Sequence, residues 1–284
     1  MDYNNKDFPI LFVSHGSTMM LGEESVVSRD WEEQGRNAER NGVQGVIILG
    51  AHWEKTGQNL VHVSIKEPPG MNPISWVAKE KYENYRINCS KDLGTTVGNI
   101  LTNGGINVVL DDTDDWIHDS LIPLKWMFPK KCPPVTLLSI NSKYDAAFHA
   151  KIGKLLSHLR SQKILLIGTG GAVHNLYRNY WPQIVIHRNN FAQEVPPDQW
   201  ALDFRDYFYD AIHTNPCTGK ASIREGVLRL MHNPRFRDAH GTDDHYMSAC
   251  FVAGASKERE VGYLTSEVWE LQNMGNSQYI IGSW

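Results

Sequence analysis

Short apolar segments that alternate with amphipathic helical segments are the feature that most constrains how this chain can fold. Six runs bounded by glycine, proline or polar residues have the length and composition of buried strands: Ile10–Val13, Val46–Leu49, Val61–Ile65, Ile106–Leu110, Val135–Ile140 and Lys163–Ile167. Six further segments have the spacing or end residues of helices: Arg29–Arg40, Lys91–Thr102, Asp145–Leu159, Trp200–Ile212, Ile223–Leu230 and His245–Ala255. This alternation predicts an α/β fold with a central, mostly parallel or mixed sheet flanked by helices on both faces.

Length and composition favour a single domain over residues 1–284. The chain is 41% hydrophobic and 21% charged, and it contains no internal repeat or low-complexity segment. Its net charge of −4 gives no electrostatic footprint for nucleic acid or an anionic membrane. No apolar run approaches the ~20 residues that span a bilayer, and the N-terminus lacks the pattern of a signal peptide. We therefore expect a soluble cytoplasmic protein, a monomer or homodimer, that binds neither nucleic acid nor membrane.

The four cysteines are scattered along the chain without CxxC spacing. We therefore expect reduced thiols rather than a disulfide framework or a cysteine zinc site. Histidine is the unusual residue type, with twelve in the chain.

Four histidines lie a few residues beyond the ends of predicted strands: His15, His52, His118 and His174. If the strands are parallel, their carboxyl ends share one rim of the sheet, which is where ligands bind in open α/β folds. Neutral imidazole is the commonest metal ligand, so this pattern is consistent with a metal site. Taken alone, the residues leave hydrogen-bonded structural histidines equally open.

A further pair, His240 and His245, lies in "DAHGTDDHYM" at the start of an apolar helical segment. Their i, i+5 spacing does not place both on one helical face, so they do not form a zincin-type HExxH pair. The "GTGGAV" segment lacks the third glycine of a dinucleotide-binding loop, and it is better explained as a sharp turn that brings His174 to the rim. His62 lies within a predicted strand and is expected to be a packing or surface residue, and the remaining histidines have no supporting context: His149, His158, His187, His213 and His232.

Five short motifs occur in order between residue 10 and about residue 255: "SHGS", "GAHWE", "HDSLIPLKWMFP", "GTGGAVHNL" and "HGTDDHY". Together they resemble the class III extradiol ring-cleavage dioxygenases, most closely the type that opens dihydroxyphenylalanine. The resemblance implies a non-haem metal enzyme that inserts O2 into a catechol-type aromatic ring and opens it to a semialdehyde carboxylate. It implies Fe(II) in the active enzyme, with Zn(II) as the alternative in the purified protein.

By motif match, the resemblance implies that His15, His52 and His245 bind the metal. His174 would face substrate and O2 as an acid–base residue, or serve as a further ligand. His118 would line the pocket as the alternative residue for proton transfer.

Three more residues are expected to bind substrate. His240 is placed in the pocket by the resemblance, and Trp53 and Tyr246 each follow an expected metal ligand. Two departures weaken any assignment of the particular catechol. Gly241 stands where the family usually has proline, and "WIHDS" surrounds His118 in place of the usual Asp-His-Gly.

Alternatives to a three-histidine iron site remain open at this point. A carboxylate ligand could come from Asp243, Asp244 or Glu267. Three histidines with an open position also describe a water-activating zinc hydrolase. A non-enzymatic binding protein of the same superfamily is the third possibility, although such a protein would be expected to lose one or more of the rim histidines.

Overall fold

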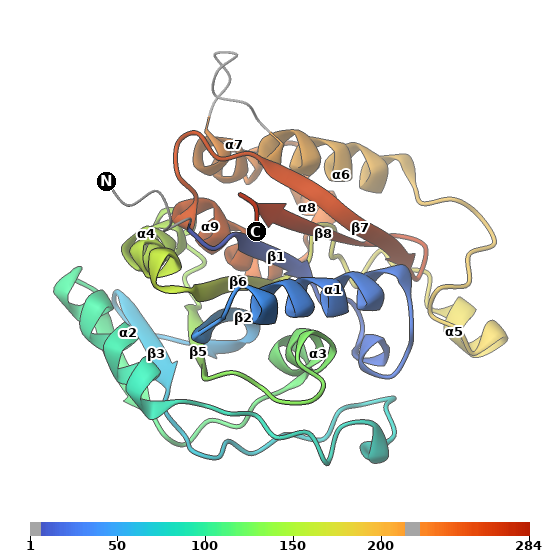
Figure 1. The fold of residues 1–284 in the computed structure, drawn as a ribbon. Helices are drawn as coiled ribbons and strands as arrows, with labels where there is room; N and C mark the ends of the chain where they lie inside the picture. Colours follow the sequence, from blue (N-terminus) through green and yellow to red (C-terminus); the bar gives the residue numbers. More distant parts are fainter. Residues whose placement is uncertain (1–6, 214–221) are drawn as a thin grey trace.

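The computed structural model describes residues 7–213 and 222–284, which are built around one mixed β-sheet (Figure 1). Within these ranges the strands are β1 (Ile10–Ser14), β2 (Gly45–Lys55), β3 (Leu60–Ser64), β4 (Asn107–Asp111), β5 (Val135–Asn141), β6 (Ile164–Gly170), β7 (Gly262–Glu270) and β8 (Met274–Ile281). Their order across the sheet is β4-β3-β5-β2-β6-β1-β8-β7. The neighbours β5, β2, β6 and β1 are parallel, whereas β8 runs antiparallel to β1 and β3 runs antiparallel to β5. The prediction of an α/β fold with a mixed sheet is confirmed.

Helices cover both faces of the sheet (Figure 1). One face carries α1 (Val26–Arg40) and α3 (His118–Met127). The other carries α2 (Lys91–Asn103), α4 (Ala146–Leu156), α6 (Gln199–Ile212), α7 (Ile223–Leu230), α8 (Phe236–Ala239) and α9 (Asp244–Ala255). The short α5 (Pro182–His187) and the 3-10 helices η1 (Thr18–Leu21), η2 (Lys79–Lys81) and η3 (Ser157–Gln162) complete the helical elements of the described ranges.

Alternation along the central strands divides the interior into two cores. In β1, Ile10 and Phe12 pack into the core on the α9 side, whereas Leu11 and Val13 pack into the core beneath α1 and α3. This follows from the two-residue period of a strand, since successive side chains point to opposite faces. A sheet buried on both faces explains why these strands read as continuous apolar runs.

Helix α9 is buried along nearly its whole length because it lies between the sheet and helices α4 and α7. Its sequence is apolar or small on every side, as expected for a helix without a solvent face. Gly170 at the end of β6 permits the close approach of this helix, since a Cβ atom there would lie 2.1 Å from the carbonyl oxygen of His245. The first turn of α9 is thereby held directly against the end of a central strand.

Several elements differ from the sequence-based expectation. Helix α1 begins at Val26 rather than Arg29, because Ser25 is the N-cap and exchanges hydrogen bonds with Ser28. The strands β7 and β8 and the helices α3, α5 and α8 were not predicted. The last two are short, α3 contains Pro123, and the strands of the β7–β8 hairpin carry many polar residues.

The cysteines Cys89, Cys132 and Cys250 are buried free thiols, while Cys217 lies outside the described residues. Burial raises the pKa of the Cys89 thiol to about 11, which makes it a poor nucleophile at neutral pH. Over the same ranges, none of the helices combines the length and the apolar character that crossing a bilayer requires.

One buried histidine, His149, ties the start of α4 to the end of β5. Its Nδ1 lies 2.7 Å from the carbonyl oxygen of Asp145, and its Nε2 lies 3.1 Å from the backbone nitrogen of Asn141. Since Asn141 N–H can only donate and the carbonyl can only accept, the ring is neutral with its proton on Nδ1. Burial lowers the pKa of His149 to about 4.

We expect His149 to make folding sensitive to acid. Between pH about 6.5 and about 4 the unfolded chain binds a proton that folded His149 does not, so stability falls as pH falls through this window, by up to about 3 kcal/mol. In metal-free protein, His149→Gln should therefore be less stable than wild type at pH 7 but lose less stability on acidification. Urea unfolding at pH 7 and pH 5 measures this difference. The same pH dependence in wild type and variant would contradict it.

Candidate metal centre

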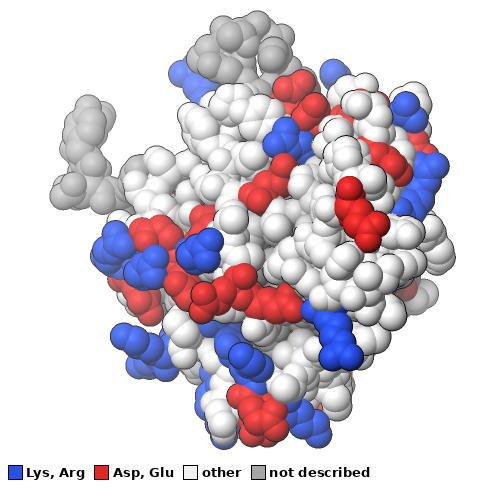
Figure 2. All heavy atoms as spheres, turned by 90° about the vertical axis from the view of Figure 1, so that its right-hand side faces the viewer, with Lys and Arg blue, Asp and Glu red and all other residues white. Residues whose placement is uncertain are grey.

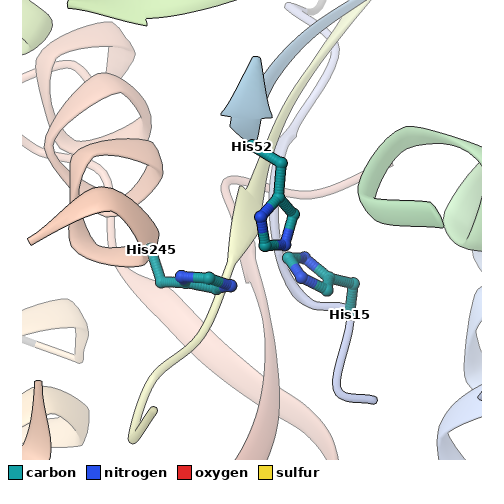
Figure 3. A group of neighbouring side chains, drawn as sticks. All are labelled: His15, His52 and His245. Carbon is teal, nitrogen blue, oxygen red and sulfur yellow. The ribbon is translucent and has the colours of Figure 1, made fainter. Parts of the chain in front are cut away.

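Three histidines from distant parts of the chain meet at the carboxyl-end rim of the parallel strands. His15 directly follows β1, His52 lies near the end of β2, and His245 lies in the first turn of α9. One ligand nitrogen of each lies within 4.8 Å of those of the other two. Figure 3 shows the three imidazole rings pointing toward one another. This is the arrangement needed to hold one metal ion.

The end of β2 leaves the regular ladder to present His52. The pairing of β2 with β5 shifts register between Leu49 and Glu54, so the intervening residues do not follow the flat strand. Gly50 is needed here, because a Cβ atom at this position would lie 2.5 Å from Oδ2 of Asp119. That carboxylate accepts hydrogen bonds from the backbone N–H groups of Ala51 and His52, at 2.9 and 3.0 Å.

A chain of hydrogen bonds also links Asp119 to His15. The Thr169 hydroxyl lies 2.8 Å from the backbone carbonyl oxygen of Asp119, which can only accept, so the hydroxyl donates to it. Thr169 Oγ1 must then accept from Nδ1 of His15, 3.1 Å away. The proton of the neutral His15 ring is therefore on Nδ1, and the lone pair is on Nε2.

The Asp119 carbonyl is free for this bond because of Pro123. In an α-helix this carbonyl would accept from the N–H four residues later, and proline has none. Asp119 therefore orients two of the three histidines, one through its side chain and one through its backbone. Sequence reasoning did not identify Asp119 or Thr169, although Asp119 is adjacent to His118 and Thr169 lies in the glycine-rich motif.

The ring nitrogens of the site suit a metal. Nε2 of His15 and both ring nitrogens of His245 are buried without a hydrogen-bond partner. Nδ1 of His245 lies 3.0 Å from Oδ2 of Asp244, but the alignment is not that of a hydrogen bond. Buried polar atoms are rarely left unpaired, so a bound cation is the natural partner for these lone pairs.

Burial also keeps these rings neutral. Desolvation, followed by the charge of His245, holds the pKa of His15 well below its usual value. Desolvation, followed by the charge of His174, does the same for His245. At pH 7 both rings can therefore bind a metal without first losing a proton.

Each of the carboxylates considered as a possible metal ligand interacts with another side chain instead. Glu267 receives two hydrogen bonds from the Arg205 guanidinium, and Asp243 pairs with Arg237. Asp244 accepts from the Thr242 hydroxyl. Among the described residues, the group able to hold a metal consists of three histidines and no carboxylate.

Two further histidines, His118 and His174, lie beside the three. The His174 ring stacks on His245 with 3.6 Å between centroids and an angle of 11°, and the His118 ring lies 4.6 Å from that of His52. Burial lowers the pKa of each to about 4. His118 reaches the site, but not from the end of a parallel strand as expected, because the preceding strand β4 runs antiparallel to the central strands. It arrives as the first residue of α3.

The three residues expected to bind substrate lie outside the lining of the cavity beside the site. Trp53 points to the other side of β2 from His52, because side chains alternate along a strand, and its ring packs near His62. Tyr246 is fully buried and donates to the carbonyl of Val227. His240 is also fully buried, with Nε2 3.2 Å from the carbonyl oxygen of Ala172.

The segment around His240 supports His174 instead. The backbone N–H of His174 donates to the carbonyl of Ala239 at 2.8 Å, and the Asn175 side chain donates to the carbonyl of Asp238. These contacts fix the backbone at His174, whereas the His240 ring does not line the cavity.

A cavity of about 360 Å³ opens beside the histidines, a volume typical of small-molecule sites. His15, His52, His118 and His174 are part of its lining. Ser17 is also part of the lining, and its backbone N–H and hydroxyl both donate to the buried carboxylate of Glu270, at 2.8 and 2.5 Å. Sequence reasoning did not identify Glu270, which lies far along the chain from Ser17.

Comparison with known proteins agrees with this site. A model of the family described as the catalytic LigB subunit of aromatic ring-opening dioxygenase matches residues 9–282. The chain belongs to the LigB family. The prediction of an extradiol ring-cleaving dioxygenase, an oxidoreductase, is confirmed, and enzymes of this family depend on a non-haem metal.

Relatives of this LigB-family chain extend over most of its length. A protein of Escherichia coli K12 named 4,5-DOPA dioxygenase extradiol is 28% identical and covers 87% of the chain and 84% of the relative. A protein of Portulaca grandiflora with the same name is 26% identical, with 94% and 93% covered. A crystal structure of an uncharacterized protein of Escherichia coli K12 has the same fold, with a TM-score of 0.76, 23% identity, and 97% and 100% of the two chains covered.

Proposed function

We propose that this chain is an Fe(II)-dependent extradiol dioxygenase in which His15, His52 and His245 hold the metal. The observation that carries the proposal is that one ring nitrogen from each of the three residues lies within 4.8 Å of the other two, and that nitrogens of His15 and His245 are buried without a hydrogen-bond partner. Zn(II) fits the same donors, so it is expected to occupy the site in protein purified without iron.

The substrate class follows from the charge of the site. Fe(II), when bound, would acidify the hydroxyl groups of a catechol and supply electron density for the reaction with O2. Three neutral imidazoles leave the positive charge of the ion uncompensated, and a deprotonated catechol can neutralise it. The product would be the semialdehyde carboxylate of the opened ring.

His174 is proposed to move the proton. It is neutral at pH 7, because burial lowers its pKa to about 4, and it lines the cavity next to the metal ligands. A neutral imidazole can accept a phenolic proton at Nδ1 or Nε2 and return it later. His118 lines the same cavity and is the second candidate.

We also propose that residues 1–284 form a single catalytic domain that acts as a monomer or homodimer. The first strand of the sheet, β1, lies beside the last, β8, so the two ends of the chain contribute to one sheet. Size-exclusion chromatography with light scattering would determine the number of chains.

Anaerobic reconstitution with Fe(II) tests the reaction. We expect the loaded protein to consume one O2 per catechol and to form a yellow ring-opened product, while the metal-free protein does neither. A zinc hydrolase would instead cleave ester or amide substrates with Zn(II) and leave catechols intact. Binding of catechols without turnover in the Fe(II)-loaded protein would support a non-enzymatic role.

The hydrogen-bond chain through Thr169 predicts a specific effect on metal affinity. Thr169→Val keeps the shape of the side chain but leaves His15 Nδ1–H without its acceptor. Loss of such a partner to a ligand typically costs 10–100-fold in metal affinity. Zn(II) dissociation constants from chelator competition measure this. Thr169→Ser retains the hydroxyl and should bind Zn(II) as wild type does. Equal affinities in all three proteins would refute the role of the hydrogen bonds through Thr169.

A further inference from the structure

The cavity beside the histidines differs from a site built for an amino acid. Its lining contains no Lys, Arg, Asp or Glu among the residues that the structure describes. The zwitterionic side chain of dihydroxyphenylalanine carries a carboxylate and an ammonium, and burial of either charge without a partner is unfavourable. The relatives named above therefore leave open which catechol this chain takes.

The Ser17 hydroxyl of the cavity lining is already engaged and does not take the place of a positively charged side chain. The backbone N–H and the hydroxyl of Ser17 both donate to Glu270. Glu270 also accepts from Asn190 and Asn276; burial raises the pKa of this carboxyl, and the four donors act in the opposite direction by stabilising its ionised form. An ionised carboxylate behind Ser17 would disfavour an anionic substituent placed against this part of the wall.

The mouth of the cavity is apolar and accessible. Trp76 is 80% exposed and Val185 is 79% exposed, and Leu176 and Trp181 beside them are about half exposed. A contiguous exposed apolar surface of this kind is unusual unless it receives a ligand or partner. Figure 2 views the molecule from the side on which α5 lies and shows broad uncharged areas between the charged clusters.

The backbone at Trp76 supports a role in ligand binding. Its φ of 66° lies in the left-handed region, which is unfavourable for a large side chain. Such strain persists where the surrounding structure enforces it and is concentrated at ligand sites. The strained residue here is one of those that line the cavity.

We propose that the substrate is a catechol with an uncharged, hydrophobic substituent that extends from the metal site across Trp76, Leu176, Trp181 and Val185. This rests on the proposed ring-opening function and specifies its substrate class. The diol would lie at the histidines, and the substituent would cover the apolar mouth. Each added methylene that becomes buried should then tighten binding about fourfold.

Dissociation constants for a matched series test this proposal. The series is 4-methylcatechol, 4-butylcatechol, 3-(3,4-dihydroxyphenyl)propionate and dihydroxyphenylalanine, titrated anaerobically against the Fe(II)-loaded protein by calorimetry. We expect 4-butylcatechol to bind at least about tenfold more tightly than the other three. Equal or tighter binding of either carboxylate-bearing catechol would overturn the proposal.

A charge introduced at the mouth provides the second test. Val185→Arg should improve binding of the propionate relative to 4-butylcatechol, and Val185→Gln, which adds length without charge, should not. No change in this ratio in the arginine variant would show that the substituent does not reach Val185. O2 consumption with the same series is a separate measurement. Absence of turnover with every catechol would reject the ring-opening function. The ranking of dissociation constants alone decides the substrate class.

Discussion

Replacement of His52 by alanine is expected to remove the bound metal and abolish ring opening. His52 supplies one of the three nitrogens that lie within 4.8 Å of one another, and two histidines alone hold a divalent ion weakly. It is also the most accessible of the three, so its loss should disturb the fold least. Metal content by mass spectrometry and O2 consumption with a catechol measure the two effects. The same result is expected for His15→Ala and His245→Ala.

Two controls make this result specific. His158→Ala removes an exposed histidine of η3 and should keep full metal content and activity. Circular dichroism and urea unfolding of metal-free His52→Ala should match metal-free wild type. Full metal occupancy in His52→Ala or His15→Ala would remove that residue from the ligand set.

The second large effect is expected at His174. His174→Ala should retain most of its metal and bind catechol as wild type does, while kcat falls about 10²–10⁴-fold, the usual contribution of a general acid–base residue. The physical reason is position: its ring lies against His245 and lines the cavity, but it is outside the three-nitrogen group. Loss of metal together with activity would show that His174 is a ligand, and His118 would then be the residue that moves the proton.

The pH profile separates these roles further. A base must be neutral, so the rate should rise with pH through the pKa of His174, which burial lowers from its usual value to about 4. This acidic limb should disappear in His174→Ala and persist in His118→Ala. If it persists in His174→Ala, the limb belongs to another group.

The sequence analysis predicted those strands and helices whose own residues carry a recognisable pattern. The four strands at the centre of the sheet are buried on both faces, so their sequences are continuous apolar runs that need no tertiary information to be recognised. Helix α9 was identified because it is apolar on all sides. The three histidines that the structure brings together were named from motif order along the chain, which is also a property of the sequence.

The C-terminal hairpin could not be found by the same criterion. β8 buries Asn276, Ser277 and Gln278, and it can do so because each is hydrogen-bonded: Asn276 and Ser277 to glutamates of β7, and Gln278 to distant segments. Gln278 accepts from the backbone N–H of Ser14 and from the Trp31 indole, on segments more than 240 residues away. A run of polar residues predicts a loop when the partners that allow its burial are unknown.

For the site, the sequence by itself determined which histidines follow strands and that five motifs occur in order. Only the tertiary structure decided which of them meet. Trp53 and Tyr246 are adjacent in sequence to the proposed ligands His52 and His245, yet neither lines the cavity, because neighbouring residues on a strand or helix point in different directions. Conversely, Asp119 and Thr169 orient His52 and His15 through contacts between separate elements, which no local pattern encodes.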